Sequence, residues 1–320
     1  MRRRDFLAAA LLTGCAAEAT RTAPWPTALT MGTGSTGGTY AVYGPAWGTL
    51  AQAATGVNLA YRATQGPNQN ILLLDRGAVQ LGMSTTAVAR QAWDGAGDWT
   101  QGMRLRGMRA LFPMYATPFH AVARAESGIV RLAQFEGRVV GVGEEGGTSG
   151  TFAPAMFALL GIRPGRLRFG GIGDQVAQVA AGALDACIIA AGAPVPAVAA
   201  EETRTELRII GFSRREVDRL CDAMPELSAG ELQRGTYRSL RTSLPVVTTF
   251  NIALCRADLP DDLAGAIVGA VMGGHAELVA RTPVAAETTA ANVGRNTVVP
   301  YHPGAEAYFA RNHIAVPRVG

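Results

Sequence analysis

The chain has 320 residues, of which 48% are hydrophobic and 17% charged, and its formal net charge is +4. This composition is too apolar for a disordered chain, and the length suits two lobes of roughly 100–200 residues. The charges are interspersed rather than gathered in basic runs, so we expect no nucleic-acid partner.

All 29 basic residues apart from histidine are arginine, because the sequence contains no lysine. This excludes a Schiff-base lysine, a P-loop lysine and a Ser–Lys dyad. The wide spacing of Cys187, Cys221 and Cys255, and the scatter of the four histidines, fit no metal motif. We therefore expect no cofactor and no metal, and one disulfide among these cysteines is possible in an oxidising compartment.

The first fifteen residues have the organisation of an export signal. Arginines at positions 2–4 precede an apolar run that ends at Leu12, about half the length that a membrane-spanning helix needs. The paired arginines predict the twin-arginine route, and the tetrapeptide Leu-Thr-Gly-Cys predicts a lipobox with Cys15 as the acylated residue. We expect a signal peptide over residues 1–15, a tether over 16–26 and a lipid-anchored periplasmic location. The alternative is a cytosolic protein with a basic, apolar tail.

Strands and helices alternate from residue 27 onward. Short apolar, β-branched runs predict strands, and the apolar faces of the segments between them predict helices. Such alternation is typical of a parallel sheet that is covered by helices on both faces. The predicted strands are 27–31, 57–63 and 79–83, and the predicted helices are 40–54, 68–76 and 85–93.

The same pattern repeats after a first crossover, which we place at two apolar runs, 109–115 and 120–124, broken by Pro118. Residues 213–245 are charged and less regular, and residues 246–256 predict the return crossover. We therefore predict an α/β fold of two doubly wound lobes joined by two hinge crossovers, with residues 27–117 plus 247–320 in lobe 1 and residues 118–246 in lobe 2. The further predicted strands are 138–143, 166–170 and 185–191, and the further helices are 132–135, 151–160, 175–183, 261–281 and 305–311.

A loop rich in glycine and hydroxyl groups follows the first predicted strand. Its glycines let the backbone approach a ligand closely, its hydroxyls both donate and accept, and the helix N-terminus behind it favours an anion. The loop also contains G-x-G-x-x-G at Gly32, Gly34 and Gly37, the fingerprint of a dinucleotide site. Arg62 follows the second strand, where an NADP-binding protein places an arginine, so an exported NADP-dependent enzyme remains an alternative.

A second loop of the same design, residues 143–151, lies at the equivalent place in the second lobe. Two shorter loops also follow predicted strands, at residues 84–86 and 192–196. Ligands of open α/β sheets bind at the carboxyl ends of strands, so all four loops are candidate walls of one cleft. The alternative is a set of unrelated turns, since Ser and Thr favour helix N-caps in any case.

These residues resemble the TAXI proteins, the solute-binding subunits of one branch of the tripartite ATP-independent periplasmic (TRAP) transporters. The first loop with its trailing Tyr40 is the most specific part, and Thr64, Gly66 and Asn70 follow before an apolar helix. Similarity continues through 109–112, 120–124, 135–143 and 192–196, and so it spans nearly the whole mature chain.

The resemblance implies a type II periplasmic-binding-protein fold, without catalysis by the chain. It also implies that a small carboxylate or amino-acid-like ligand is delivered to TRAP membrane subunits, and we expect the binding protein to be a monomer. The binding positions that the resemblance implies are Gly34, Ser35, Thr36, Gly37, Gly38, Thr39, Tyr40, Ser84, Thr85, Thr86, Thr148, Ser149, Gly150, Thr151, Gly192, Ala193 and Pro194.

One departure from the family bears on the ligand. The family's second loop commonly ends in an arginine, and here Gly150 takes that position. Loss of a bidentate guanidinium argues against glutamate-like recognition, unless Arg62 or Arg124 compensates. Glu144 and Glu145 would further disfavour an anion if they face the cleft. A ligand-sensing module that signals to a membrane receptor would share this cleft, and it is the second alternative.

Overall fold

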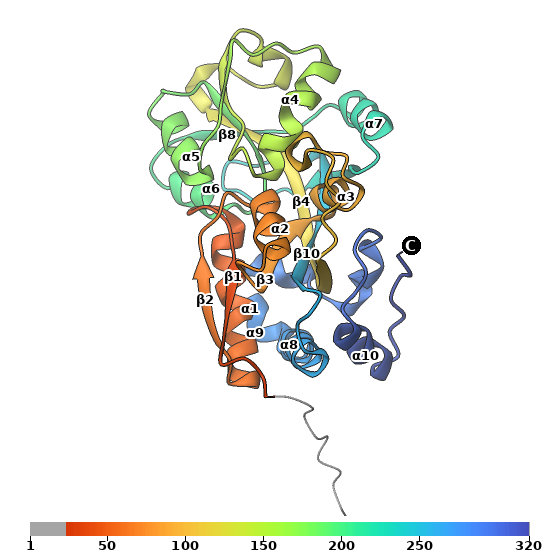
Figure 1. Ribbon diagram of the computed structural model, residues 1–320. Helices are drawn as coiled ribbons and strands as arrows, with labels where there is room; N and C mark the ends of the chain where they lie inside the picture. The colour runs from red at the N-terminus through yellow and green to blue at the C-terminus, as the bar shows by residue number, and fades with distance from the viewer. Residues whose placement is uncertain (1–23, 320) are drawn as a thin grey trace, which may run out of the picture.

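The structure, a computed structural model, describes residues 24–319. The predicted signal peptide, Cys15 and most of the tether lie outside the described residues. Figure 1 shows two lobes, one above the other, which are joined by the long strands β4 (Met108–Arg124) and β10 (Leu244–Arg256).

The first lobe is built from a parallel sheet with helices between its strands, as the alternation predicts. Strand β1 pairs in parallel with both β2 and β3, and every residue of β3 is buried. In α1 the buried residues Tyr43, Trp47 and Leu50 recur at helical spacing. The elements are β1 (Ala28–Gly32), α1 (Thr39–Thr55), β2 (Asn58–Arg62), α2 (Pro67–Asp75), β3 (Leu81–Thr85) and α3 (Thr86–Asp94).

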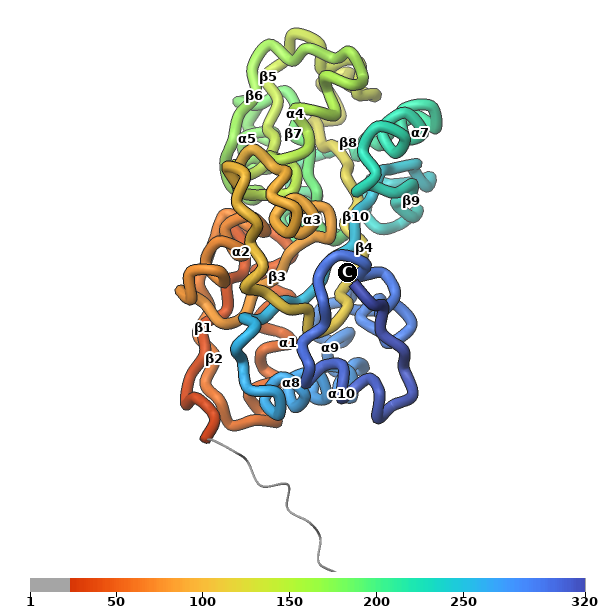
Figure 2. The backbone as a smooth tube through the Cα atoms, turned by 45° about the vertical axis from the view of Figure 1, so that its right-hand side comes forward, coloured from red at the N-terminus to blue at the C-terminus, as the bar shows by residue number. Residues whose placement is uncertain are grey.

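Strands β4 and β10 run antiparallel to each other and pass from one lobe to the other side by side (Figure 2). Strand β10 pairs with β3, and β4 continues into the second lobe, where it pairs with β7 and β8. The predicted break at Pro118 is wrong, because β4 is one strand. Pro118 is the last residue of β4 that pairs with β10, opposite Thr248, and Phe119 is the first that pairs with β7, so Pro118 lies where β4 changes partner.

The second lobe repeats the strand–helix pattern, with β5 parallel to β6 and β7. The segment 213–245 is more regular than its sequence suggests, because it contains α7 and β9. A capping box between Ser213 and Glu216 begins α7, a signal that is readable in the sequence. The elements are β5 (Val139–Gly141), α4 (Thr148–Leu160), β6 (Arg166–Arg168), α5 (Ile172–Ala180), β7 (Ala186–Ala190), α6 (Pro196–Glu201), β8 (Leu207–Ile210), α7 (Arg214–Ala223) and β9 (Ser228–Leu232).

The C-terminal helices return to the first lobe (Figure 1). The single helix predicted over 261–281 is wrong, because α8 (Asp261–Gly273) and α9 (His275–Arg281) meet at Gly274 with a bend of 69°. Helix α10 (Pro303–Arg311) packs on α8. Within residues 24–319 no single helix is long and apolar enough to cross a membrane, and the α8–α9 pair reaches that length only across its bend. The 3₁₀ segments are Asp98–Thr100, Ala125–Ser127, Leu132–Phe135, Pro283–Glu287 and Ala290–Arg295.

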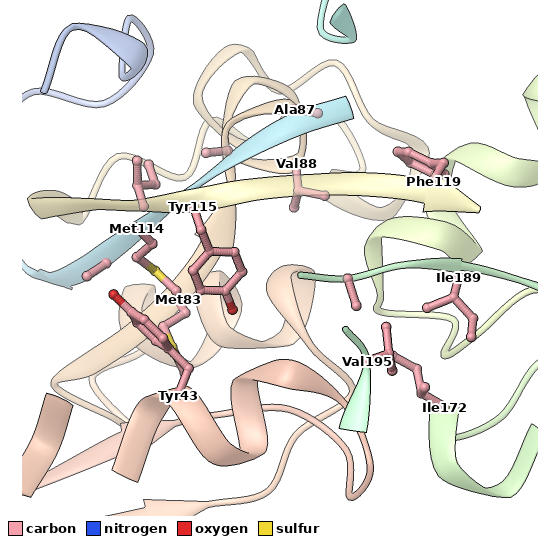
Figure 3. Close-up of a cluster of buried hydrophobic side chains, with 14 of the residues drawn as sticks. Tyr43, Met83, Ala87, Val88, Met114, Tyr115, Phe119, Ile172, Ile189 and Val195 are labelled. Atoms are coloured by element: carbon pink, nitrogen blue, oxygen red, sulfur yellow. The ribbon is translucent and has the colours of Figure 1, made fainter. Parts of the chain in front are cut away.

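A continuous core follows β4 through both lobes. Figure 3 shows Met114 and Tyr115 on the first-lobe side of this strand and Phe119 further along it, near Ile189 and Val195. The rings of Tyr43 and Tyr115 meet edge to face, with centroids 4.9 Å apart. The three cysteines of the described chain are free thiols, so the possible disulfide among them does not form.

Candidate functional site

A small cavity of about 40 Å³ lies between the two lobes. Both predicted Gly-rich loops contribute to its wall, together with residues at the ends of β3 and β7. The lining residues are Gly34, Ser35, Gly38, Thr39, Tyr40, Gly66, Pro67, Thr85, Thr117, Glu144, Gly147, Thr148, Ser149, Ile172, Ala190, Ala191 and Gly192.

The first loop is held in place by the residues that carry the family resemblance. The side-chain amide of Asn70 donates to the carbonyl oxygens of Thr33 (2.8 Å) and Met83 (2.9 Å), and its Oδ1 accepts from the Thr64 hydroxyl (2.8 Å). A Cβ at Gly32 would lie 2.5 Å from Asn70 Oδ1, so this position needs glycine. The loop is thereby tied to the ends of β1 and β3, which fixes where its hydroxyls point.

The second loop is shorter than predicted, because α4 begins at Thr148 rather than at residue 151. Thr148 and Ser149 therefore lie in the first turn of a helix and line the cavity. Helices α1, α2, α4 and α5 all begin at cavity-lining residues, and Thr85, the N-cap of α3, also lines it. Five helix N-termini thus point toward one cavity, and each carries a partial positive charge.

Hydrogen bonds between the lobes close the structure around this cavity. The Thr39 hydroxyl donates to the Gly192 carbonyl oxygen (2.6 Å), and the Asn68 backbone N–H donates to the Gly146 carbonyl oxygen (3.1 Å). The Asn68 side-chain amide also donates to the Thr151 hydroxyl (3.1 Å). The structure therefore has residues of the first lobe in direct contact with loops of the second lobe.

Glycine permits this close approach at the first loop. Gly37 has φ +84°, and a Cβ there would lie 2.8 Å from the Gly173 Cα and 3.0 Å from the Ala197 Cβ. Its carbonyl oxygen accepts from the Ala197 N–H (3.1 Å), and that of Thr36 accepts from the Gly173 N–H (3.3 Å). A side chain at Gly37 would hold the lobes apart.

Tyr40 connects the first loop to both crossing strands. Its ring lines the cavity, and its hydroxyl donates to Oδ1 of Asn251 in β10 (2.6 Å). The Asn251 amide in turn donates to the Tyr115 carbonyl oxygen (2.7 Å) and to the Thr117 hydroxyl, both in β4. Tyr40 is thus positioned by a fully buried asparagine at the junction of the lobes.

Glu144 brings a carboxyl group into the cavity wall. It is only 9% exposed, and its Oε1 accepts from the backbone N–H of Ile172 at the start of α5 (3.3 Å). Burial raises the pKa of this carboxyl, hydrogen bonds from Ser35 and Ile172 partly oppose that rise, and the charge of Asp174 adds to it. The neighbouring Glu145 is exposed.

The remaining predicted site residues lie beside the cavity rather than in its lining. Thr36 and Gly37 face the second lobe, and Ala193 and Pro194 follow the lining residue Gly192. The side chains of Ser84, Thr86 and Thr151 bond within the protein, to the Thr85 carbonyl oxygen, the Thr249 hydroxyl and the Gly147 carbonyl oxygen respectively. Gly150 packs against the second loop itself, where a Cβ would lie 2.0 Å from the Glu144 carbonyl oxygen.

Neither Arg62 nor Arg124, the two arginines considered as replacements for the missing guanidinium, reaches the cavity. Arg62 is exposed on β2, and Arg124 forms an ion pair with Glu126 (2.6 Å) at the end of β4. Within residues 24–319, no arginine lines this cavity. The wall therefore offers hydroxyls, backbone groups and one carboxyl group.

Other lining residues were not among the predicted site residues. Thr117 and Ala190 belong to strands whose apolar runs indicate only core, and Ile172 and Pro67 begin helices. Gly66 has φ +103° and brings the start of α2 to Gly147 of the second loop. The helix starts were a usable signal, because the N-termini of helices that follow parallel strands face the carboxyl edge of the sheet.

Residues 31–311 match the model of the NMT1-like family. Among solved structures, the chain is similar to an ancestral arginine-binding protein bound to arginine, at 11% identity and a TM-score of 0.54, over 82% of this chain and 100% of that one. It is also similar to the GluR0 ligand-binding core from Nostoc punctiforme in complex with L-glutamate, at 13% identity and a TM-score of 0.50, over 81% and 99%. These likenesses confirm the predicted fold, that of type II periplasmic binding proteins.

Proposed function

The chain belongs to the NMT1-like family, and from that premise we propose that it is an extracytoplasmic solute-binding protein that closes its two lobes around a small organic solute. The observation that carries this proposal is the cavity between the lobes, which is lined by both Gly-rich loops and enclosed by hydrogen bonds across them. The solute stabilises closure because it binds the closed arrangement more tightly than the open one.

We further propose that the protein serves TRAP-type secondary transport as a TAXI subunit. The support is the sequence resemblance, in particular the first loop with Tyr40 and the Thr64–Asn70 pair that positions it. In this role the protein binds a carboxylate or amino-acid-like solute and passes it to TRAP membrane subunits, and it performs no covalent chemistry. The lobe boundaries of the prediction, with residues 118–246 as the inserted lobe, belong to the same proposal.

The dinucleotide alternative fits the first loop less well. In a dinucleotide site the last glycine of the fingerprint lets the helix pack closely on its strand, whereas Gly37 lies against Gly173 and Ala197 of the second lobe. We therefore retain the solute-binding function alone.

A pair of neighbouring substitutions tests the site. Ser35 lines the cavity, whereas the side chain of Thr36 is exposed outside it. The solutes to test are those that raise the melting temperature of the wild-type protein. We expect Ser35→Ala to bind them about 5- to 10-fold more weakly, because the hydrogen bond between the Ser35 hydroxyl and the solute is lost. Thr36→Ala is the matched control and should bind as the wild type does. Calorimetry that gives equal affinities for all three proteins would contradict the site.

The export proposal is tested at Cys15, outside the described residues. We propose a lipid-anchored periplasmic protein, and we expect Cys15→Ala to move it from the membrane fraction to the soluble periplasmic fraction, because the acylated residue is lost. Immunoblots of the two fractions would measure this. If the variant sediments with membranes as the wild type does, Cys15 is not the anchor.

A further inference from the structure

Glu144 is a buried acidic side chain in the wall of the proposed solute cavity. It follows β5 in the second loop, and only 9% of it is exposed, whereas Glu145 beside it is exposed. Acidic side chains are almost never buried in this way unless they are paired. We therefore expect the buried Glu144 carboxylate to have a partner of opposite charge.

Within the part of the chain that the structure describes, this carboxyl group has hydrogen bonds but no cationic partner. Oε1 accepts from the Ile172 N–H (3.3 Å), and the Ser35 hydroxyl forms a second hydrogen bond with the group. An ionised carboxylate has about four lone-pair sites, so acceptor capacity remains for a ligand. The described residues that line the cavity include no arginine, and the whole chain has no lysine.

A second negative charge lies near Glu144. Asp174, on α5, is the acidic group that acts on Glu144 through its charge. An anionic solute would bring a further negative charge into the same enclosed space, where like charges repel strongly. A cationic group on the solute would instead provide the opposite charge that a buried carboxylate requires.

On the basis of the proposed function, we infer that the solute carries a protonated nitrogen, and that Glu144 is the residue that selects it. The chemical class is a small amine or amidine, amino acids included. The hydroxyls of Thr39, Thr85 and Thr148 also line the cavity. The first donates to the Gly192 carbonyl oxygen and the other two bond to each other, so their oxygens keep acceptor capacity for donors of the solute. The N-termini of the helices that begin at these residues can accept a carboxylate group of the solute.

A solute library tests this assignment at pH 7. It contains amines and amino acids, nitrogen-free carboxylates, and uncharged amides and polyols, and it is screened by thermal shift against the wild type, Glu144→Gln and Glu145→Gln. We expect only compounds with a protonated nitrogen to raise the melting temperature of the wild type. Calorimetry should show that Glu144→Gln binds these compounds about 10- to 100-fold more weakly, because a charge-assisted hydrogen bond is lost.

The controls separate binding from folding. Glu145→Gln removes the same charge one residue away and should bind as the wild type does, because Glu145 is exposed. Without a solute, Glu144→Gln should have a melting temperature no lower than that of the wild type, because the substitution removes a buried charge.

Two results would overturn the inference or its premise. If a nitrogen-free carboxylate binds the wild type, and binds Glu144→Gln equally or more tightly, Glu144 does not select a cation, and the solute-binding function stands. If no compound of any class binds the wild type, the proposed function itself fails.

Discussion

His120 is a fully buried histidine within the crossing strand β4. Its Nδ1 lies 3.2 Å from the Pro118 carbonyl oxygen, which can only accept, so Nδ1 carries the proton. Its Nε2 accepts from the Tyr237 hydroxyl (2.8 Å), whose oxygen accepts from the Val195 N–H (2.9 Å). The ring thus joins β4 to the segment that follows β7, and it does so in the neutral form.

Burial lowers the pKa of His120 to about 4, from an ordinary value of 6.5. Between these two pH values the unfolded chain binds more protons at this residue than the folded chain does, so stability falls as pH falls through the window. A shift of this size corresponds to about 3 kcal/mol once the pH lies below both values.

We predict that His120→Gln removes most of this pH dependence, because an amide cannot be protonated in this range and its oxygen can accept from Tyr237. The free energy of unfolding, measured by urea denaturation from pH 7 to pH 4, should fall less in the variant by up to about 3 kcal/mol. The matched control is His313→Gln at an exposed position. Parallel pH profiles for His120→Gln and the wild type would show that the ring is not held neutral by the fold.

At the scale of an element, the first turn of α4 explains the glycine at position 150. The resemblance leads one to expect an arginine there, but a Cβ would lie 2.0 Å from the Glu144 carbonyl oxygen. An arginine at this position would therefore require the second loop to move. The glycine and the inward position of Glu144 belong to one local arrangement, since both depend on how this loop folds onto the helix.

We predict that Gly150→Ala destabilises the protein by about 1–3 kcal/mol, because the added methyl group overpacks the loop. Gly273→Ala is the matched control, since Gly273 is also helical and a Cβ there meets nothing within 4 Å. That change should be neutral or stabilising by up to about 1 kcal/mol, because alanine favours helix. Thermal denaturation of both variants measures the difference, and equal effects would contradict the packing argument.

At the scale of the whole molecule, the lobes are joined by two strands and held closed by a few hydrogen bonds between loops. Asn68 contributes two of these bonds, one through its backbone and one through its side chain to Thr151. Such an arrangement permits the lobes to separate about the crossing strands while each lobe keeps its own core. Residues near the closing loops should therefore affect opening more than folding.

We predict that Asn68→Ala shifts the free protein toward an open arrangement, because the bond to Thr151 is lost. Small-angle scattering should show a larger radius of gyration, and a bound solute should dissociate about 5- to 10-fold faster. Asn58→Ala, at an exposed position on β2, is the control. Identical scattering curves and equal dissociation rates would show that this contact does not hold the lobes together.

The predicted elements of the first lobe agree with the structure to within about two residues, because each depends on local periodicity and on a glycine or a cap at its end. The errors occur where contacts with neighbouring elements determine the structure. Pro118 is accommodated because β4 changes partners there, and the helix predicted over 261–281 bends at Gly274. Neither event depends on the sequence of the segment alone.

By itself, the sequence determined the α/β alternation, both Gly-rich loops and the lack of lysine chemistry, since these depend on residue type and spacing along the chain. Only the tertiary structure decided which side chains share the cavity. Ser35 and Ile172 are far apart in the chain, yet both hydrogen-bond with Glu144, because the crossing strands join the strands of both lobes in one continuous sheet. The inward direction of Glu144 and the outward direction of Glu145 likewise follow from the course of one loop on α4, which no pattern in the sequence records.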